Sequence, residues 1–345
     1  MDFGFTEEQT MLGESLARTL ERGADDSALF DLGAGAALMT EEAGGFGGSG
    51  ADILMVFRTL GRAGAVTPLL DSVVLGAGIL ADAGEADLAE AAASGAARIA
   101  VALDEPGQRY DGTVATRAEG DRLTGEKSVV PGAEDATHLI VRATDGLWLV
   151  ETGAEGLAMR GYALMDGGRA AEVTLKDTAA RRIGDVSLLE QPLAAAILAV
   201  CADALGVMEK AVELTTDYLK TRKQFGVTLN KFQALNFRAA DMYVSLELAR
   251  SIALWASVVQ LSDGDVVTAA DRARLTTSRT GRHIGKDAIQ LHGGIGVTAE
   301  YKVGHYTSRL TAIDHLLGDG DFAADRLAAK VGSYPTVDPI GAPYA

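Results

Sequence analysis

The fold of this chain is decided by the stretch Tyr218-Leu-Lys-Thr-Arg-Lys-Gln-Phe-Gly-Val-Thr-Leu-Asn-Lys-Phe-Gln233, where one long helical pattern ends and another begins. Upstream of it, from Pro192, apolar residues recur every three or four positions, which is typical of one face of an α-helix. Downstream, helices are expected from Phe232 to Leu261 and over residues 265–293 and 319–331. Long helices joined by short loops predict an antiparallel bundle.

The size and charge of the chain restrict what it can do. It has 345 residues, a formal net charge of −17 and one cysteine, Cys201. This length predicts two or three subdomains around a large core. An acidic surface repels phosphate groups, so we expect neither nucleic acid nor an anionic membrane as a partner. The acidic start is unlike a signal peptide, no apolar run is expected to span a membrane, and the single cysteine fits a reducing cytoplasm.

The first part of the chain reads as helical. Thr6 and Gln9 have the spacing of a capping box, which predicts a helix to about Arg22. The glycine-rich run Ala43-Gly-Gly-Phe-Gly-Gly-Ser-Gly50 then interrupts the helical pattern, and a flexible connector is its simplest interpretation. Residues 53–96 are again helical and rich in alanine. We therefore predict an N-terminal helical domain over residues 1–97.

The character of the sequence changes near Arg98. Short segments rich in β-branched residues follow, separated by Gly, Asp and Pro turns, and they predict a small antiparallel sheet domain over residues 98–186. The expected strands are 99–103, 112–117, 122–130, 137–141, 147–150 and 171–175. Residues 187–345 are then assigned to a C-terminal four-helix bundle with an extended tail. The predicted fold class is α+β.

Two segments could bind a ligand. Arg222 and Phe225 project from a helix end, where a guanidinium matches phosphate and an aromatic ring can stack on a nucleobase. By residue type alone, a helix-end arginine and a core phenylalanine are the simpler interpretation. The segment Gln290-Leu-His-Gly-Gly-Ile-Gly296 could bring backbone N–H groups to a phosphate, although Gly293 could equally be a helix C-cap. His283 and His292 do not have the spacing of a metal-ligand pair, and no metal site is expected.

Taken in order, these segments resemble the acyl-CoA dehydrogenase family over nearly the whole chain. The most specific similarities are in the C-terminal half, in type, order and approximate spacing. The matching segments are Met1–Gln9, Glu41–Gly50, Asp104-Glu-Pro106, Arg222-Lys-Gln-Phe-Gly226 with Phe232-Gln233, Ala239-Ala-Asp-Met242, and Gln290–Gly296.

The resemblance implies a three-part fold, usually assembled as a tetramer, with FAD lying across a subunit interface. In such enzymes a glutamate removes the α-proton of an acyl-CoA thioester, the β-hydride passes to the flavin, and an electron-transfer flavoprotein accepts the electrons. By this resemblance, one set of residues would hold the pyrophosphate and adenine of a flavin whose ring lies in the neighbouring chain: Arg222, Phe225, Gln233, Gln290, Gly293 and Gly294.

Other family features are missing. The ring-side strand, Trp-Ile-Thr in the family, reads Lys127-Ser-Val-Val-Pro131 here. The two positions that carry the glutamate in different family subsets fall near Leu317 and at Ala196-Ile197, and Glu190 would need a register shift of more than a turn. Asp319 is the closest substitute, although an N-cap of the last helix is its simpler role.

These features predict a catalytically silent subunit that completes the flavin site of a homologous partner carrying the glutamate. Heteromeric family members with short, base-lacking subunits act on bulky CoA thioesters such as steroid side chains, so the resemblance suggests that substrate class. Two alternatives stay open. The chain could be a self-sufficient homo-oligomeric dehydrogenase that uses Asp319, or a flavin-free assembly module.

Overall fold

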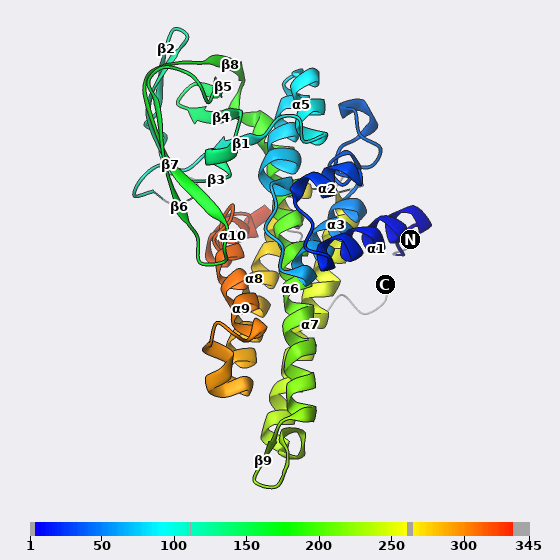
Figure 1. Ribbon diagram of the computed structural model, residues 1–345. Helices are drawn as coiled ribbons and strands as arrows, with labels where there is room; N and C mark the ends of the chain where they lie inside the picture. Colours follow the sequence, from blue (N-terminus) through cyan, green and yellow to red (C-terminus); the bar gives the residue numbers. More distant parts are fainter. Residues whose placement is uncertain (1–3, 109, 111, 261–264, 334–345) are drawn as a thin grey trace, which may run out of the picture.

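The computed structural model describes residues 4–108, 110, 112–260 and 265–333. Helices form the N-terminal and C-terminal parts, and strands form the region between them, which confirms the α+β class (Figure 1). The strands gather at one end of the molecule beside the N-terminal helices, and the long C-terminal helices extend away from them. The predicted tail, residues 334–345, lies outside the described residues.

The N-terminal part begins as its capping signal predicts. Thr6 accepts a hydrogen bond from the Gln9 N–H, and the Gln9 side chain accepts one from the Thr6 N–H, so the capping box is complete. The glycine run is not a flexible connector, because a Cβ on Gly47 would lie 2.4 Å from the Ala37 carbonyl oxygen. The helices are α1 (Glu7–Glu21), α2 (Asp26–Asp31), α3 (Gly50–Ala63), the π-helical segment η3 (Leu69–Ala77), α4 (Gly78–Asp82) and α5 (Ala86–Ala93).

The central part contains two four-stranded sheets. One has the order β1 (Ile99–Ala102), β4 (His138–Ala143), β5 (Gly146–Glu151) and β8 (Arg181–Gly184); the other has the order β2 (Arg117–Glu119), β3 (Arg122–Pro131), β7 (Arg169–Ala179) and β6 (Leu157–Ala163). The prediction of purely antiparallel pairing is wrong, because β1 pairs with β4 in parallel. Parallel neighbours need a long connection, and here β2 and β3 lie within it. Strands β6 and β8 were not predicted. Of the strand expected over residues 112–117, only Arg117 lies in a strand, as the first residue of β2.

The C-terminal part is organised around one central helix. This helix, α6 (Glu190–Thr221), packs against α3, α7 (Gln233–Val259), α8 (Val266–His292) and α9 (Lys302–Ile313). Helix α9 was not predicted, and α10 (Gly320–Ala329) falls within the last expected helix. Helix α7 begins one residue after the predicted start, and its predicted end, Leu261, lies outside the described residues.

A buried carboxylate ties three helices together. Glu209 of α6 is 5% exposed and receives hydrogen bonds from Arg58 and Arg62 of α3 and from Arg250 of α7. Burial alone would raise the pKa of Glu209, but these guanidinium groups outweigh it and lower the pKa. The ionised form is therefore the one that joins the N-terminal and C-terminal parts.

Two helices are long and apolar enough to cross a membrane by length and composition alone. In α6, 83% of the most apolar stretch is buried inside the fold, as in a core helix, whereas the figure for α7 is 33%. The expectation that no apolar run reaches this length is therefore corrected. The apolar residues of α6 are mostly buried in the core, whereas several large apolar residues of α7 are exposed on its surface.

Candidate functional site

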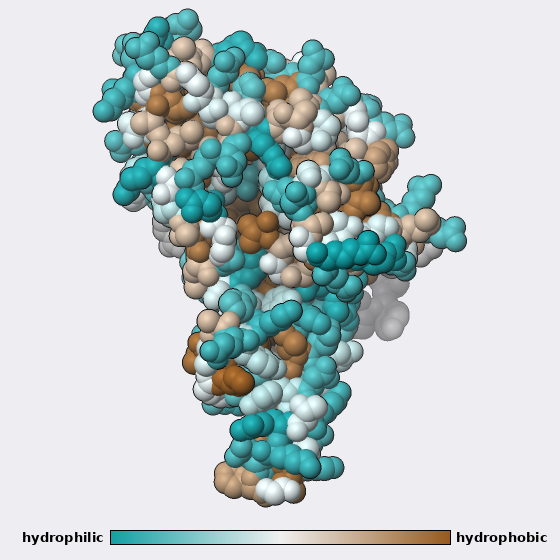
Figure 2. Space-filling model, viewed as in Figure 1, coloured by the Kyte–Doolittle hydropathy of each residue, from teal (hydrophilic) through white to brown (hydrophobic). Residues whose placement is uncertain are grey.

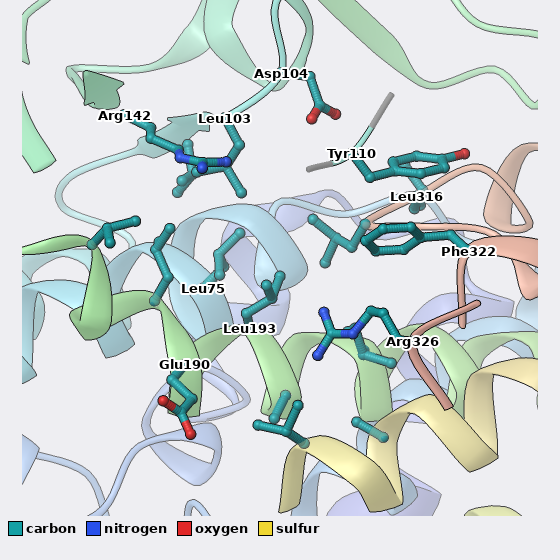
Figure 3. Close-up of a pocket in the computed structure, with 18 of the residues that line it drawn as sticks. Leu75, Leu103, Asp104, Tyr110, Arg142, Glu190, Leu193, Leu316, Phe322 and Arg326 are labelled. Carbon is teal, nitrogen blue, oxygen red and sulfur yellow. The ribbon is translucent and has the colours of Figure 1, made fainter. Parts of the chain in front are cut away.

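A cavity of about 810 Å³ lies where the three parts of the chain meet. Its walls come from η3, from strands β1, β3 and β4, from the first turns of α6 and α8, and from α10 with the loop before it. Figure 3 shows Arg142 and Leu103 on the side of the strands, Glu190 and Leu193 on α6, and Phe322 and Arg326 on α10. The rings of Tyr110 and Phe322 lie 5.3 Å apart at one side of this cavity.

One face of α6 forms a wall of the cavity. Glu190, Leu193, Ala194 and Ile197 have the spacing of one helix face, and all four line the cavity. Ala196 is fully buried and is not among the lining residues. Glu190 is exposed and lies about 10 Å before Ile197, at a rise of about 1.5 Å per residue. Of Ala196 and Ile197, where the resemblance places the glutamate of one family subset, Ile197 therefore faces the cavity with an aliphatic side chain.

The loop before α10 presents Leu317 to the same cavity. Leu317 has a φ of 55°, a conformation that side chains larger than glycine seldom adopt. Arg274 of α8 is 2% exposed and holds this loop by donating to the carbonyl oxygens of Ile313 (2.7 Å), Leu316 (3.0 Å) and Gly318 (2.7 Å). The loop is therefore held in place by α8. Leu317, the residue that it places in the cavity wall, cannot accept a proton.

Asp319 does not face the cavity. Its carboxylate accepts a hydrogen bond from the Phe322 N–H at 2.8 Å and caps α10, and the residue is 5% exposed. It is not among the residues that line the cavity. The N-cap role considered for Asp319 is therefore confirmed.

On the side of the strands, a buried ion pair supports the cavity wall. Glu105 accepts hydrogen bonds from Lys127 Nζ (2.8 Å), Thr116 Oγ1 (2.7 Å) and the Ala115 N–H (2.7 Å), and Lys127 is fully buried. Burial alone would raise the pKa of Glu105, but the hydrogen bonds from Lys127 and Thr116 bring it to about 2. The pair anchors β3 next to the segment that follows β1.

The end of β3 contributes mainly apolar groups to the cavity wall. A bulge between Lys127 and Val130 places Val129 at a φ of 51°, and Val129 and Pro131 line the cavity. Proline has neither a hydroxyl nor a backbone N–H. Of this segment, Ser128 contributes the one hydroxyl to the wall.

Several charged side chains in the wall have no hydrogen bond or ion pair to any residue within the described ranges. Asp104 and Glu190 are two of them, and Asp71 of η3 and Arg142 of β4 are two more. Burial raises the pKa of Asp71 to about 6, although the charge of Arg309 acts in the opposite direction. Sequence reasoning missed Asp71 and Arg142, because neither lies in a recognisable motif and their neighbours come from distant segments.

The six predicted cofactor residues lie at the other end of the helices, and all are exposed. Arg222 ends α6 and is followed by a hairpin of β9 (Lys223–Gln224) and β10 (Val227–Thr228). Its turn residues, Phe225 and Gly226, have φ of 52° and 82°, as a type I′ turn requires. Phe225 is 90% exposed, so the expectation of a core phenylalanine is wrong. Figure 2 shows apolar side chains at the lower tip of the molecule, where this hairpin lies.

The ends of α6 and α8 lie side by side at this tip. The rings of Tyr218 and His292 are stacked at 4.5 Å, which brings Arg222 and the glycine turn to the same region. Gly293 is the C-cap of α8, and a Cβ added to Gly293 or Gly294 would meet nothing within 4 Å. Open glycine backbone and a guanidinium without an ion pair to described residues fit the pyrophosphate of a dinucleotide, and an exposed ring fits its base.

The cavity and this exposed tip are far apart within one chain. Ile197 and Arg222 lie on the same helix, and their 25-residue separation corresponds to about 37 Å at the rise of an α-helix. The predicted phosphate-binding residues and the cavity therefore occupy opposite ends of the bundle.

Sequence comparisons show relatives that cover almost the whole chain. Residues 186–332 match the family profile "Acyl-CoA dehydrogenase, C-terminal domain". Acyl-CoA dehydrogenase FadE28 of Mycobacterium tuberculosis is 30% identical, with 96% of this chain and 99% of that protein covered. Acyl-CoA dehydrogenase IpdE2 of the same organism is 30% identical, with 92% and 91% covered.

Solved structures resemble the whole chain. A chain of the ChsE4-ChsE5 complex from Mycobacterium tuberculosis matches with a TM-score of 0.89 and 25% identity, covering 97% of this chain and all of that one. A chain of the Tcur3481-Tcur3483 steroid ACAD, solved as a variant, matches with a TM-score of 0.85 and 30% identity, covering 95% and 98%. With this similarity along almost its full length, the chain belongs to the acyl-CoA dehydrogenase family.

Proposed function

We propose that this chain is the non-catalytic subunit of a heteromeric, FAD-dependent acyl-CoA dehydrogenase. It supplies the pyrophosphate- and adenine-binding residues for a flavin whose ring lies in a homologous partner subunit. FAD, when bound, accepts the hydride that leaves the β-carbon of the acyl-CoA thioester. The observation that carries the proposal is the separation of about 37 Å along α6 between Ile197, in the cavity wall, and Arg222 at the exposed tip.

The separation matters because one flavin dinucleotide is too short to reach both ends. If Arg222, Phe225 and Gln290 bind the pyrophosphate and adenine, the ring of that flavin must lie in another chain. The turn at Phe225 supports this role, because the aromatic ring is held at positive φ and stays 90% exposed, although its edge-to-face contact with Phe232 lies at 6.1 Å. A partner that stacks or packs on the ring would stabilise it.

The residues at the predicted base positions support the silent role. Proton abstraction needs a carboxylate within hydrogen-bonding reach of the α-carbon. By the resemblance, the glutamate of the family falls near Leu317 or at Ala196-Ile197, and these residues are aliphatic. Of the two acids considered instead, Asp319 caps α10, and Glu190 lines the cavity about two turns from Ile197.

A partner subunit would also cover the apolar face of α7. Contiguous exposed apolar residues of this kind mark protein interaction sites. The large apolar residues exposed on this helix are Phe237, Tyr243, Val244, Leu248 and Trp255. The ChsE4-ChsE5 complex pairs two different chains, which supports a homologous partner that carries the glutamate.

The substrate class and setting follow from the same relatives. The Tcur3481-Tcur3483 steroid ACAD resembles this chain over almost its full length, which supports a bulky steroid side-chain CoA thioester as the substrate of the complex. We place the complex in the cytoplasm, with an electron-transfer flavoprotein as its electron acceptor.

The test is co-expression with a homologous chain that carries the glutamate, followed by visible spectra. We expect a flavin band in the complex and none in this chain alone. Arg222→Ala should release flavin from the complex, whereas Arg18→Ala, an exposed arginine of α1, should not.

Each alternative predicts a different result. If this chain alone is yellow and reduces an artificial acceptor with an acyl-CoA, it is self-sufficient. If the Arg222→Ala complex keeps its flavin in full, the residue makes no cofactor contact, and a flavin-free assembly role is favoured.

A further inference from the structure

A carboxylate without a partner among the described residues lies next to aliphatic side chains in the wall of the cavity. The carboxylate is Asp71, on the π-helical segment η3. We propose that the cavity of this chain binds an apolar alcohol, whose hydroxyl donates a hydrogen bond to Asp71. The proposal goes beyond the subunit role, which leaves this cavity without a function.

The cavity has the size and surface of a ligand site. Its volume of about 810 Å³ lies within the range of about 300–1,000 Å³ that small-molecule sites occupy. Such sites are mostly apolar and hold a few polar groups that orient the ligand. Apolar wall residues come from all three parts of the chain: Leu70, Leu75, Val101, Leu103, Leu193, Ile197, Val267, Leu316 and Leu317.

Asp71 is available for a ligand because Arg309, the cation that acts on its pKa, is already paired with other carboxylates. Arg309 of α9 acts electrostatically on Asp71, but its guanidinium donates to Asp166 at 2.5 Å and to Asp203. No ion pair joins Asp71 to any residue in the described part of the chain. Burying a carboxylate beside apolar groups costs free energy unless it accepts hydrogen bonds, and the described residues supply none to the Asp71 side chain. A hydrogen bond from a ligand would offset this desolvation cost.

The π-helical backbone around Asp71 also supports a ligand site. Helical segments with π geometry are rare and are frequently found at functional sites. Here the π-helical segment runs over nine residues and contributes Leu70, Asp71 and Leu75 to the cavity wall. This irregular geometry brings a charged residue into the wall between aliphatic neighbours.

The chemistry of the wall selects an alcohol among possible ligands. A carboxylate at pH 8 accepts hydrogen bonds and cannot donate them, so it favours a hydroxyl over a ketone of the same shape. An acidic head group would be repelled by Asp71, and an ammonium group would have to be desolvated among the aliphatic walls. Burial raises the pKa of Asp104 and lowers that of Lys127. The charge of Arg142 acts to lower both of these pKa values, and it has no such effect on Asp71.

A matched pair of ligands tests the proposal directly. The probes are the 3-hydroxy and 3-keto forms of one saturated steroid, titrated into the full chain at pH 8 by calorimetry. The alcohol can donate a hydrogen bond to the charged Asp71 carboxylate, and the ketone cannot. We therefore expect the alcohol to bind about tenfold more tightly than the ketone. In Asp71→Asn the preference should disappear, because an amide can both accept from a hydroxyl and donate to a ketone.

A control variant separates the effect of Asp71 from that of Glu190, another carboxylate of the cavity wall. Glu190→Gln removes a carboxylate at the mouth and should keep the tenfold preference. Equal binding of the two steroids by the unchanged protein, a preference that survives in Asp71→Asn, or failure of both steroids to bind would overturn the proposal. These results do not depend on flavin or on a partner subunit, so they are independent of the Arg222→Ala test.

Discussion

Replacing Asp71 with asparagine should make this protein more stable at neutral pH. The pKa of Asp71 is raised from 3.8 to about 6 in the folded chain. One unit of difference between the folded and unfolded pKa values corresponds to about 1.4 kcal/mol. With this conversion, the ionised Asp71 lowers the free energy of unfolding by up to about 3 kcal/mol at pH 8. Water that enters the cavity would reduce this figure. Asp71→Asn removes the charge at nearly constant volume and should therefore raise the free energy of unfolding.

The pH dependence gives the sign of the effect. For a carboxyl whose folded pKa is raised, the destabilisation is absent below pH 3.8, grows as the pH rises, and is complete above about pH 6. The gain from Asp71→Asn should thus be about 3 kcal/mol at pH 8 and about half of that at pH 5. Urea unfolding followed by circular dichroism at the two pH values measures it. The exposed Glu190→Gln should change stability by less than about 0.5 kcal/mol at either pH. A destabilised Asp71→Asn protein, or the same gain at both pH values, would refute the reasoning.

Three further variants probe the scaffold. Lys127→Met leaves Glu105 buried without its cation and should cost about 3–5 kcal/mol in urea unfolding. Since Glu105 has a lowered pKa of about 2, its stabilisation is present above about pH 4.5 and should be lost as the pH falls toward 2 in the unchanged protein, which acid titration of the circular dichroism signal detects. Arg274→Met leaves three loop carbonyls without their donor and should lower the melting temperature in calorimetry, with faster hydrogen exchange confined to the loop before α10. Glu209→Gln removes the charge that pairs with three arginines and should cost a few kcal/mol in urea unfolding, whereas Arg18→Ala on the surface should change stability by less than about 1 kcal/mol.

Local signals in the sequence predicted local structure well. The hydroxyl of Thr6 and the amide of Gln9 form the predicted capping box, because both partners lie within one helical turn. Asp319 caps α10 for the same reason. The apolar spacing after Pro192 became the central helix of the bundle, since a long three-to-four periodicity has few other solutions.

Features that depend on distant segments were not predictable. The parallel pairing of β1 with β4 is invisible to a pattern of β-branched residues, which gives strand positions but not partners or directions. Helix α9 carries several polar and β-branched residues, and its packing against α6 and α8 outweighs a weak local preference. Asp71 and Arg142 become candidates only when segments from three parts of the chain enclose a cavity.

The buried Arg274 has an evolutionary consequence. It fixes the loop before α10 through the carbonyl oxygens of Ile313, Leu316 and Gly318, and it makes no demand on the side chain at position 317. A lineage can therefore exchange a proton-accepting residue there for leucine, or the reverse, without rebuilding the backbone. After a gene duplication, one copy could give up chemistry in a single substitution while both copies kept the shape needed to assemble.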